Sequence, residues 1–268
     1  MQDFVSRIKP FNNEHSIKEA AISLFLVNKI IKPERYQKLI ENQFKGKFKK
    51  FDRTEQVQIQ LQKKEQSSSI ITNTLKDTGF RFSDFDASGK TTKVFQGQNE
   101  INRTFISFHT LDYTVWGQFY SDFIDTLKGF AEESKEFFIN SFSLQYIDVF
   151  NWQGGVNEFV TEHFFNMTGS ILPSAFFKSK FNRTYLLTIE EEINNLTFFD
   201  RIEIKTENKI LPEISIVHNV AHKFDVEQEL SNIISEQDFQ SMLNIAHDRN
   251  KDILGNILTQ DIKTLINL

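Results

Sequence analysis

The chain has 268 residues, and 31 lysines and arginines against 36 aspartates and glutamates give it a formal net charge of −5. An apolar content of 39% is too high for a disordered protein, and the negative charge removes a general case for phosphate-driven nucleic-acid binding. The absence of cysteine excludes disulfides, thiolate metal ligands and cysteine catalysis. Without a long apolar run or a signal-peptide core, the chain is expected to be soluble and cytoplasmic, with no membrane partner.

The first residues predict a strand followed by a helix. Residues 17–27 are apolar and unbroken by glycine or proline, as expected of a buried strand. Residues 33–48 begin with a proline and predict an amphipathic helix. Its apolar positions at helical spacing are Tyr36, Leu39, Ile40 and Phe44.

Extended structure dominates the next part of the chain. Residues 55–62 alternate glutamines with Val57, Ile59 and Leu61, a strict period of two that predicts a strand with one polar and one apolar face. Residues 69–108 continue as short extended segments, with turn residues at 77–79, 86–90 and 97–100. This spacing favours an antiparallel meander.

The period then changes to that of a helix over residues 112–131, and returns to that of a strand over 137–152. We expect the aromatic stripe of this helix to lie on the sheet. The stripe consists of Trp116, Phe119, Tyr120, Phe123, Leu127 and Phe130.

Polar residues and two glycines at 151–155 predict a boundary. It divides the chain into an N-terminal α+β half, 1–152, and a C-terminal α+β half with a helical end, 153–268; one continuous domain is the alternative. The second half predicts strands at 183–193, 197–206 and 213–224, with Asn194 and Asn195 as a hairpin turn, and then helices at 227–234, 236–250 and 253–268.

The predicted fold class is therefore α+β. We expect an antiparallel sheet, with a mixed sheet as the alternative, built as β-α-ββββ-α-β followed by αβββα. The helices are expected on one face, with further helices at the C-terminus.

Two motifs imitate ligand loops around residue 88. Residues 88–91 read Ser-Gly-Lys-Thr, the end of a phosphate-binding loop, but Asp84 stands where its first glycine belongs and a strand follows instead of a helix. Residues 84–89 also resemble half of a calcium loop, without its final glutamate. A plain turn between strands is the favoured interpretation.

Metal chemistry is suggested in two further places. Asp200, Glu203 and Lys205 imitate the acids and lysine of a metal-dependent nuclease, at a shorter spacing than usual, and they also suit a solvated strand face. His218 and His222 have zinc spacing only on a helix; on the predicted strand they stand about 13 Å apart. The sequence thus assigns no catalytic residue, metal ligand or cofactor.

One basic cluster is a candidate partner-binding strip. Its cations alternate with phenylalanines and suit an acidic protein or RNA, whereas the alternative is a solvated helix end. The strip consists of Lys45, Lys47, Lys49, Lys50 and Arg53.

Several segments together resemble a bacterial family of similar length known only as "sporadically distributed". They are Ile17-Lys18-Glu19-Ala20, Gly79-Phe80-Arg81-Phe82, the heptapeptide YTVWGQF at 113–119, Leu144-Gln145-Tyr146-Ile147-Asp148, and residues 243–258 with His247. Gln145 and Asp148 depart from the arginine and asparagine of the family pattern. The resemblance implies a domain of no established chemistry that bacteria carry patchily, near mobile or defence-related genes.

Together these features lead us to expect a non-catalytic interaction protein: a partner-binding subunit, sensor or neutraliser of a phage-defence or toxin–antitoxin-like system. Its expected partner is a protein encoded nearby, with a second copy of the chain or a nucleic acid as alternatives. The alternative functions are a ligand- or nucleic-acid-binding sensor and a metal-dependent nuclease.

Overall fold

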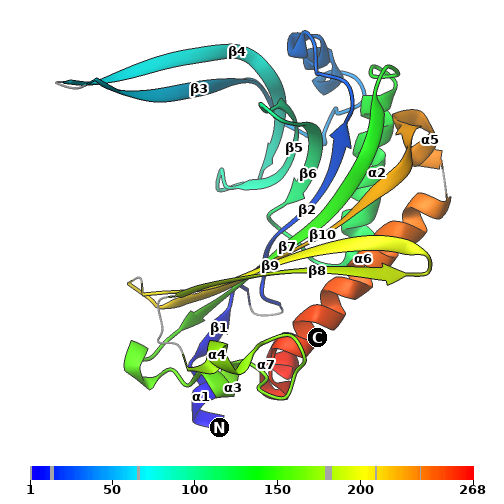
Figure 1. Cartoon of the computed structure of the whole chain (residues 1–268). Coiled ribbons are helices and arrows are strands. Elements are labelled where there is room, and N and C mark those ends of the chain that lie inside the picture. The colour runs from blue at the N-terminus through cyan, green and yellow to red at the C-terminus, as the bar shows by residue number, and fades with distance from the viewer. Residues whose placement is uncertain (1, 13–14, 65–66, 179–182, 209, 236) are drawn as a thin grey trace.

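A computed structural model describes residues 2–12, 15–64, 67–178, 183–208, 210–235 and 237–268, and for residues 56–77 the backbone alone. The described part confirms the α+β class (Figure 1). Its strands are β1 (Ile8–Pro10), β2 (Ile17–Leu26), β3 (Lys50–Lys64), β4 (Ser67–Phe85), β5 (Thr91–Asn99), β6 (Thr104–Thr110), β7 (Phe138–Trp152), β8 (Arg183–Ile193), β9 (Leu196–Glu207) and β10 (Glu213–Glu229). Its helices are α1 (Gln2–Ser6), the 3₁₀ helix η1 (Pro33–Ile40), α2 (Trp116–Ala131), the 3₁₀ helix η2 (Val156–Glu158), α3 (Thr161–Phe164), α4 (Ser174–Phe177), α5 (Leu230–Ser235), α6 (Gln237–Ile257) and α7 (Gln260–Leu265).

One antiparallel sheet joins these strands in the order β3-β4-β5-β6-β2-β7-β10-β9-β8, and β1 pairs with β7. Strand β7 lies inside the sheet and pairs with β2 on one side and β10 on the other. Strands from both sides of residue 152 are therefore part of one sheet. The hairpin between β8 and β9 turns at Asn194 and Asn195, whose φ angles of 53° and 63° are those of a type I′ turn, as the sequence predicts.

The helices α2, α5 and α6 cover one face of the curved sheet (Figure 1). Helix α2 buries Phe119, Phe123, Leu127 and Phe130 of its stripe there: Phe119 and Phe123 pack on Phe108 of β6, and Phe130 packs on Phe95 of β5. This confirms the predicted contact with the sheet for these residues, whereas Trp116 and Tyr120 are half-buried. A second hydrophobic cluster gathers α1, α3, α4 and α7 around the end of β7 near Trp152. Among the described residues no helix combines the length and apolar character that a membrane crossing requires.

The amphipathic helix expected over 33–48 is wrong in its type and length. The chain forms η1 over Pro33–Ile40 and then turns, with Gly46 at a φ of 78°. Tyr36 and Leu39 are both buried. Their spacing of three residues puts them on one side of a 3₁₀ helix, whose turn contains three residues.

The turn expected at residues 77–79 is also wrong, because β4 continues through these residues, although its pairing with β3 shifts register between Thr54 and Gln56. Gly79 serves the sheet instead: a Cβ atom there would collide with the carbonyl oxygen of Gly97 on β5 and stand 2.7 Å from Oγ1 of Thr54 on β3. A close approach of neighbouring strands requires glycine for the same steric reason as many turns do. The helix expected from residue 227 begins at Leu230, since β10 extends to Glu229.

Strands β3 and β4 extend beyond the sheet as a two-stranded ribbon (Figure 1). The pairing of β4 with β5 covers only Gly79–Phe85, whereas Gln56–Lys64 of β3 pair with Ser67–Leu75 of β4 alone. The predicted strand at 55–62 is thus confirmed by the backbone. The predicted division of its side chains between two faces lies outside the described residues.

Candidate ligand-binding pocket

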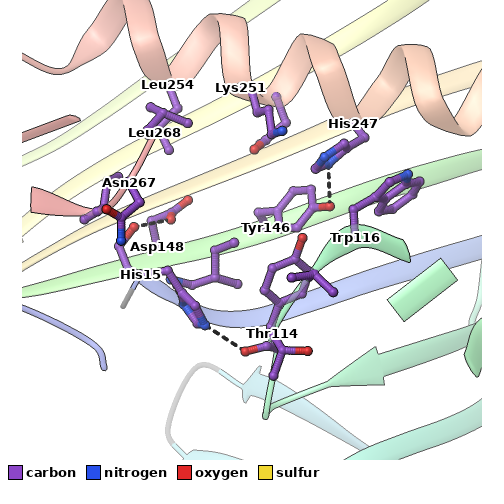
Figure 2. A pocket seen from close by; sticks show the side chains of 16 residues that line it. His15, Thr114, Trp116, Tyr146, Asp148, His247, Lys251, Leu254, Asn267 and Leu268 are labelled. Atoms are coloured by element: carbon purple, nitrogen blue, oxygen red, sulfur yellow. Dashed lines mark hydrogen bonds between the residues drawn. The ribbon is translucent and has the colours of Figure 1, made fainter. Parts of the chain in front are cut away.

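A pocket of about 420 Å³ opens beside the centre of the sheet. Its floor comes from β2 and β7, one wall from the segment that leads into α2, and the opposite wall from α6 and the residues after α7 (Figure 2). The residues that line it include His15, Ser16, Tyr113, Trp116, Tyr146, Asp148, His247, Asn250 and Lys251.

Asp148 is a buried acid on the floor of this pocket. It follows Tyr146 by two residues on β7, so both side chains leave the same face of the strand, and its exposed fraction is 1%. The hydroxyl of Ser16 donates a 2.6 Å hydrogen bond to Asp148 Oδ1. No described residue hydrogen-bonds to Oδ2, and burial raises the pKa of Asp148 to about 6. The pocket therefore contains a carboxylate with unused hydrogen-bonding capacity.

A hydrogen-bonded row of side chains forms the wall next to Asp148. The hydroxyl of Tyr113 forms a hydrogen bond with the hydroxyl of Tyr146. The Tyr146 hydroxyl also lies 2.9 Å from Nδ1 of His247. Burial raises the pKa of Tyr113 to about 12 and lowers that of His247 to about 4. At neutral pH these groups are uncharged, so they do not neutralise Asp148.

Trp116 completes this wall. Its indole stacks on the His247 ring at 4.5 Å and 5°, and its Nε1 donates to Oδ1 of Asn244 at 2.9 Å. Trp116 is the first residue of α2, and it is half-buried, with its ring stacked on His247 of α6.

His15 positions the segment that carries Tyr113. Its Nδ1 accepts a hydrogen bond from the Ile17 backbone N–H at 3.1 Å, and its Nε2 lies 2.7 Å from the Tyr113 carbonyl oxygen. The Nδ2 amino group of Asn12 also lies 2.8 Å from Nε2. His15 thus links the start of β2 to the opposite wall of the pocket.

A buried polar network holds α6 on the sheet behind the pocket. Arg249 donates to Asp200 on β9 through Nε at 2.6 Å and also reaches Glu191 on β8 at 2.7 Å. The other oxygen of Asp200 lies 2.9 Å from Nε2 of His218 on β10, and Asn250 Nδ2 lies 2.9 Å from Nδ1 of that ring. Desolvation would raise the pKa of Asp200, but its hydrogen bonds to His218 and Arg249 bring the pKa below its usual value. The network therefore holds an ionised, paired acid.

This network explains why the predicted nuclease residues do not form a joint site. Asp200 points to the helices, whereas Glu203 is an odd number of residues away on β9, faces the other side of the sheet and pairs with Lys205 at 2.6 Å. His218 and His222 both lie on strand β10, as expected, and His222 bonds the Thr197 carbonyl oxygen. In the described part of the chain no group of three or more acids and histidines is arranged to hold a metal ion.

The motif at 88–91 is a turn between β4 and β5. Asp86 Oδ1 accepts hydrogen bonds from the backbone N–H groups of Ser88 and Lys90 and from the Ser88 hydroxyl. Gly89 takes a φ of 85°. The carboxylate occupies the place where a phosphate would sit, so the turn interpretation fits the geometry.

The predicted partner strip lies at the end of η1 and the start of β3. Its lysines are exposed, but Lys49 pairs with Asp84 at 3.1 Å and Lys50 with Asp52 at 2.9 Å. Lys47 Nζ lies 3.4 Å from the Asp125 carbonyl oxygen, and Lys45 and Arg53 complete the exposed strip. Acidic neighbours thus offset part of the charge, and the pocket lies elsewhere.

The sequence predicts no common site for the segments that form the pocket. Tyr113 and Trp116 belong to the heptapeptide at 113–119, Tyr146 and Asp148 to the segment at 144–148, and His247 to the C-terminal segment. The signal that was available is an acid in a strand among apolar neighbours, but only the fold brings the segments together.

Comparison with known proteins finds no match: no protein-family model, no curated protein and no solved structure matches the chain.

Proposed function

We propose that this protein is a ligand-binding sensor whose pocket captures a small molecule through Asp148. The observation that carries the proposal is a buried carboxylate that faces a cavity and has the Ser16 hydroxyl as its hydrogen-bond partner among the described residues. A buried charge without adequate partners costs several kcal/mol, and proteins retain such groups mainly where a ligand or a reaction uses them. A ligand N–H group or cation at Oδ2 would offset this cost.

The surroundings of Asp148 favour binding over bond-making chemistry. Tyr113, Tyr146 and His247 bond to one another, and the Trp116 N–H bonds to Asn244. Aromatic and aliphatic side chains make up much of the remaining lining, and about 420 Å³ is within the range of small-molecule sites. A few oriented polar groups in a mainly apolar cleft are typical of recognition.

The proposal is tested by ligand-induced thermal shifts of the whole chain. A panel of amines, amidines, amides, nucleosides and carboxylates is screened against the wild-type protein, Asp148→Asn and Asn219→Leu, a control on the face of β10 away from the pocket. A ligand at a hundred times its Kd adds about 2.7 kcal/mol to the free energy of unfolding. We expect shifts from N–H donors in wild type and control, and none in Asp148→Asn. Shifts that persist in Asp148→Asn would contradict the proposal.

A second candidate function is partner binding, and the ribbon of β3 and β4 favours it. An isolated two-stranded ribbon is only marginally stable in water. Contact with the surface of a partner would therefore stabilise the projecting part of β3 and β4 (Figure 1). In this proposal the chain is a component of a bacterial phage-defence or toxin–antitoxin-like system in the cytoplasm, and its partner is a protein encoded nearby. Co-purification of the tagged chain with the products of neighbouring genes should give a stoichiometric complex. A lone chain from that operon would contradict this candidate.

A further inference from the structure

We propose that the ligand presents a planar cation with several N–H groups, of the guanidinium or amidinium type, to the floor of the pocket. The inference rests on the proposed sensor function and adds the chemical class of the ligand. It depends on two oxygen atoms, one from Asp148 and one from Asn250, that the hydrogen bonding of the protein leaves for the pocket.

The orientation of Asn250 follows from the network behind it. Asp200 is ionised and can only accept, so Nε2 of His218 must carry a proton and donate it. In the neutral ring Nδ1 then accepts, and its partner is the Nδ2 amino group of Asn250 at 2.9 Å. An amide that turns its amino group to the network turns its carbonyl oxygen away from it, and Asn250 lines the pocket. The network thus makes Asn250 an acceptor toward the ligand.

Asp148 supplies the second acceptor and the negative charge. It stands on β7 under the helix that carries Asn250, and its Oδ2 is the oxygen that Ser16 does not use. Two hydrogen-bond acceptors that line one cavity favour a ligand with two hydrogen-bond donors. A carboxylate favours a positively charged ligand. A guanidinium or amidinium group has both properties and donates in a fixed planar geometry.

The walls favour a planar group over a tetrahedral ammonium. The aromatic rings of Tyr113, Tyr146, Trp116 and His247 line the same cavity, and planar cations stack on aromatic faces (Figure 2). Lys251 also lines the pocket but is exposed. Its positive charge opposes a cation near the mouth, so the cationic end of the ligand belongs at Asp148.

The test compares four probes that share a butyl chain: butylguanidinium, butylammonium, butyltrimethylammonium and the neutral butylurea. Calorimetric titration at pH 7.5 should rank butylguanidinium as the tightest binder. Each lost charge-assisted hydrogen bond corresponds to about tenfold in Kd, so we expect butyltrimethylammonium to bind about a hundredfold more weakly.

Three variants assign the effect to the residues. Asp148→Asn should abolish the binding of all three cations, and Asn250→Leu should reduce the preference for butylguanidinium over butyltrimethylammonium about tenfold. Lys251→Gln should tighten the binding of all three cations and leave butylurea unchanged. Asn250→Ser, a smaller change, serves as a second variant if Asn250→Leu does not fold, and Asn219→Leu is the control.

Equal affinity for butylguanidinium and butyltrimethylammonium, or an unchanged preference in both Asn250 variants, would overturn the inference. Absence of binding by all cations would overturn it as well. If butylurea or another neutral donor still binds in an Asp148-dependent manner, the sensor function stands while the ligand class is wrong.

Discussion

At the scale of single residues, Asp148 is a buried carboxyl group whose desolvation cost is offset only in part by its hydrogen bond with Ser16. Burial raises its pKa from an ordinary value of 3.8 to about 6, because desolvation outweighs the hydrogen bond from Ser16. The folded protein therefore holds a proton on Asp148 between these pH values that the unfolded chain has already lost. The free energy of unfolding contributed by this group falls as the pH rises from below 4 to above 6.

Asp148→Asn should accordingly stabilise the protein at pH 7.5 by about 3 kcal/mol, the free energy that corresponds to this pKa difference. At pH 5 the gain should be smaller, because part of the wild-type population still has a protonated Asp148. Urea unfolding of both proteins at the two pH values measures the difference in their free energies of unfolding. The contributions of the titrating groups that both proteins share cancel in this difference. A gain of equal size at pH 5 and pH 7.5 would contradict the proposed charge burial.

A variant that is more stable and yet binds no ligand would identify Asp148 as a functional residue. Sites that bind charged ligands commonly reduce the stability of the empty protein. The same reasoning separates Asp148 from Asp200, whose charge is compensated by His218 and Arg249.

At the scale of elements, α6 is held on the sheet by polar as well as apolar contacts. His247 reaches Tyr146 on β7, Asn250 reaches His218 on β10, and Arg249 reaches Asp200 on β9. These contacts determine which residues of α6 face the pocket. Directional hydrogen bonds specify the register of a helix on a sheet more narrowly than apolar contacts do.

Arg249→Ala should lower the free energy of unfolding by about 3–5 kcal/mol, because it leaves the carboxylate of Asp200 buried with one partner fewer. Lys50→Ala is the control, since its pair with Asp52 is exposed and should matter by about 1 kcal/mol or less. Thermal or urea unfolding measures both. An Arg249 variant as stable as the Lys50 variant would show that the network does not hold α6.

Two glycines, one in a strand and one in a helix, differ in the space around their Cα atoms. Gly79→Ala should destabilise the protein by about 1–3 kcal/mol, because the new methyl group meets the Gly97 carbonyl and Thr54. Gly117→Ala, in α2 with open space around its Cα, should stabilise it by about 0.4–1 kcal/mol by restricting the unfolded chain. Unfolding curves with the same slope against urea allow the comparison, and the two substitutions should have opposite signs.

At the scale of the whole molecule, the sheet and the ribbon differ in how they are supported. The sheet is covered by α2, α5 and α6, whereas the outer part of β3 and β4 pairs only with itself (Figure 1). Its removal exposes no further edge of the main sheet, because Lys50–Thr54 of β3 still pair with Gly79–Ser83 of β4.

Replacement of residues 57–74 by a two-residue turn should therefore leave the fold intact. We expect a circular dichroism spectrum of unchanged shape apart from the lost strand signal, a Tm close to that of the wild type, and unchanged ligand binding at the pocket. If the ribbon is the partner-binding element, the shortened chain should lose the stoichiometric complex. Loss of cooperative unfolding would show that the ribbon belongs to the folding core.

The sequence by itself determined the α+β class, the C-terminal helices, and the strands at 183–193 and 213–224, because local periodicity and turn chemistry act within a few residues, but it did not predict α1 or β1. It also determined the stripe of α2. Local signals failed at Gly79 and at η1, where a neighbouring strand and a three-residue turn decided the outcome. Only the tertiary structure decided the pocket, because Tyr113, Asp148 and Asn250 come from segments far apart along the chain. Long-range strand pairing and the docking of α6 bring these residues together. Neither of these interactions can be recognised from a periodic pattern in the sequence.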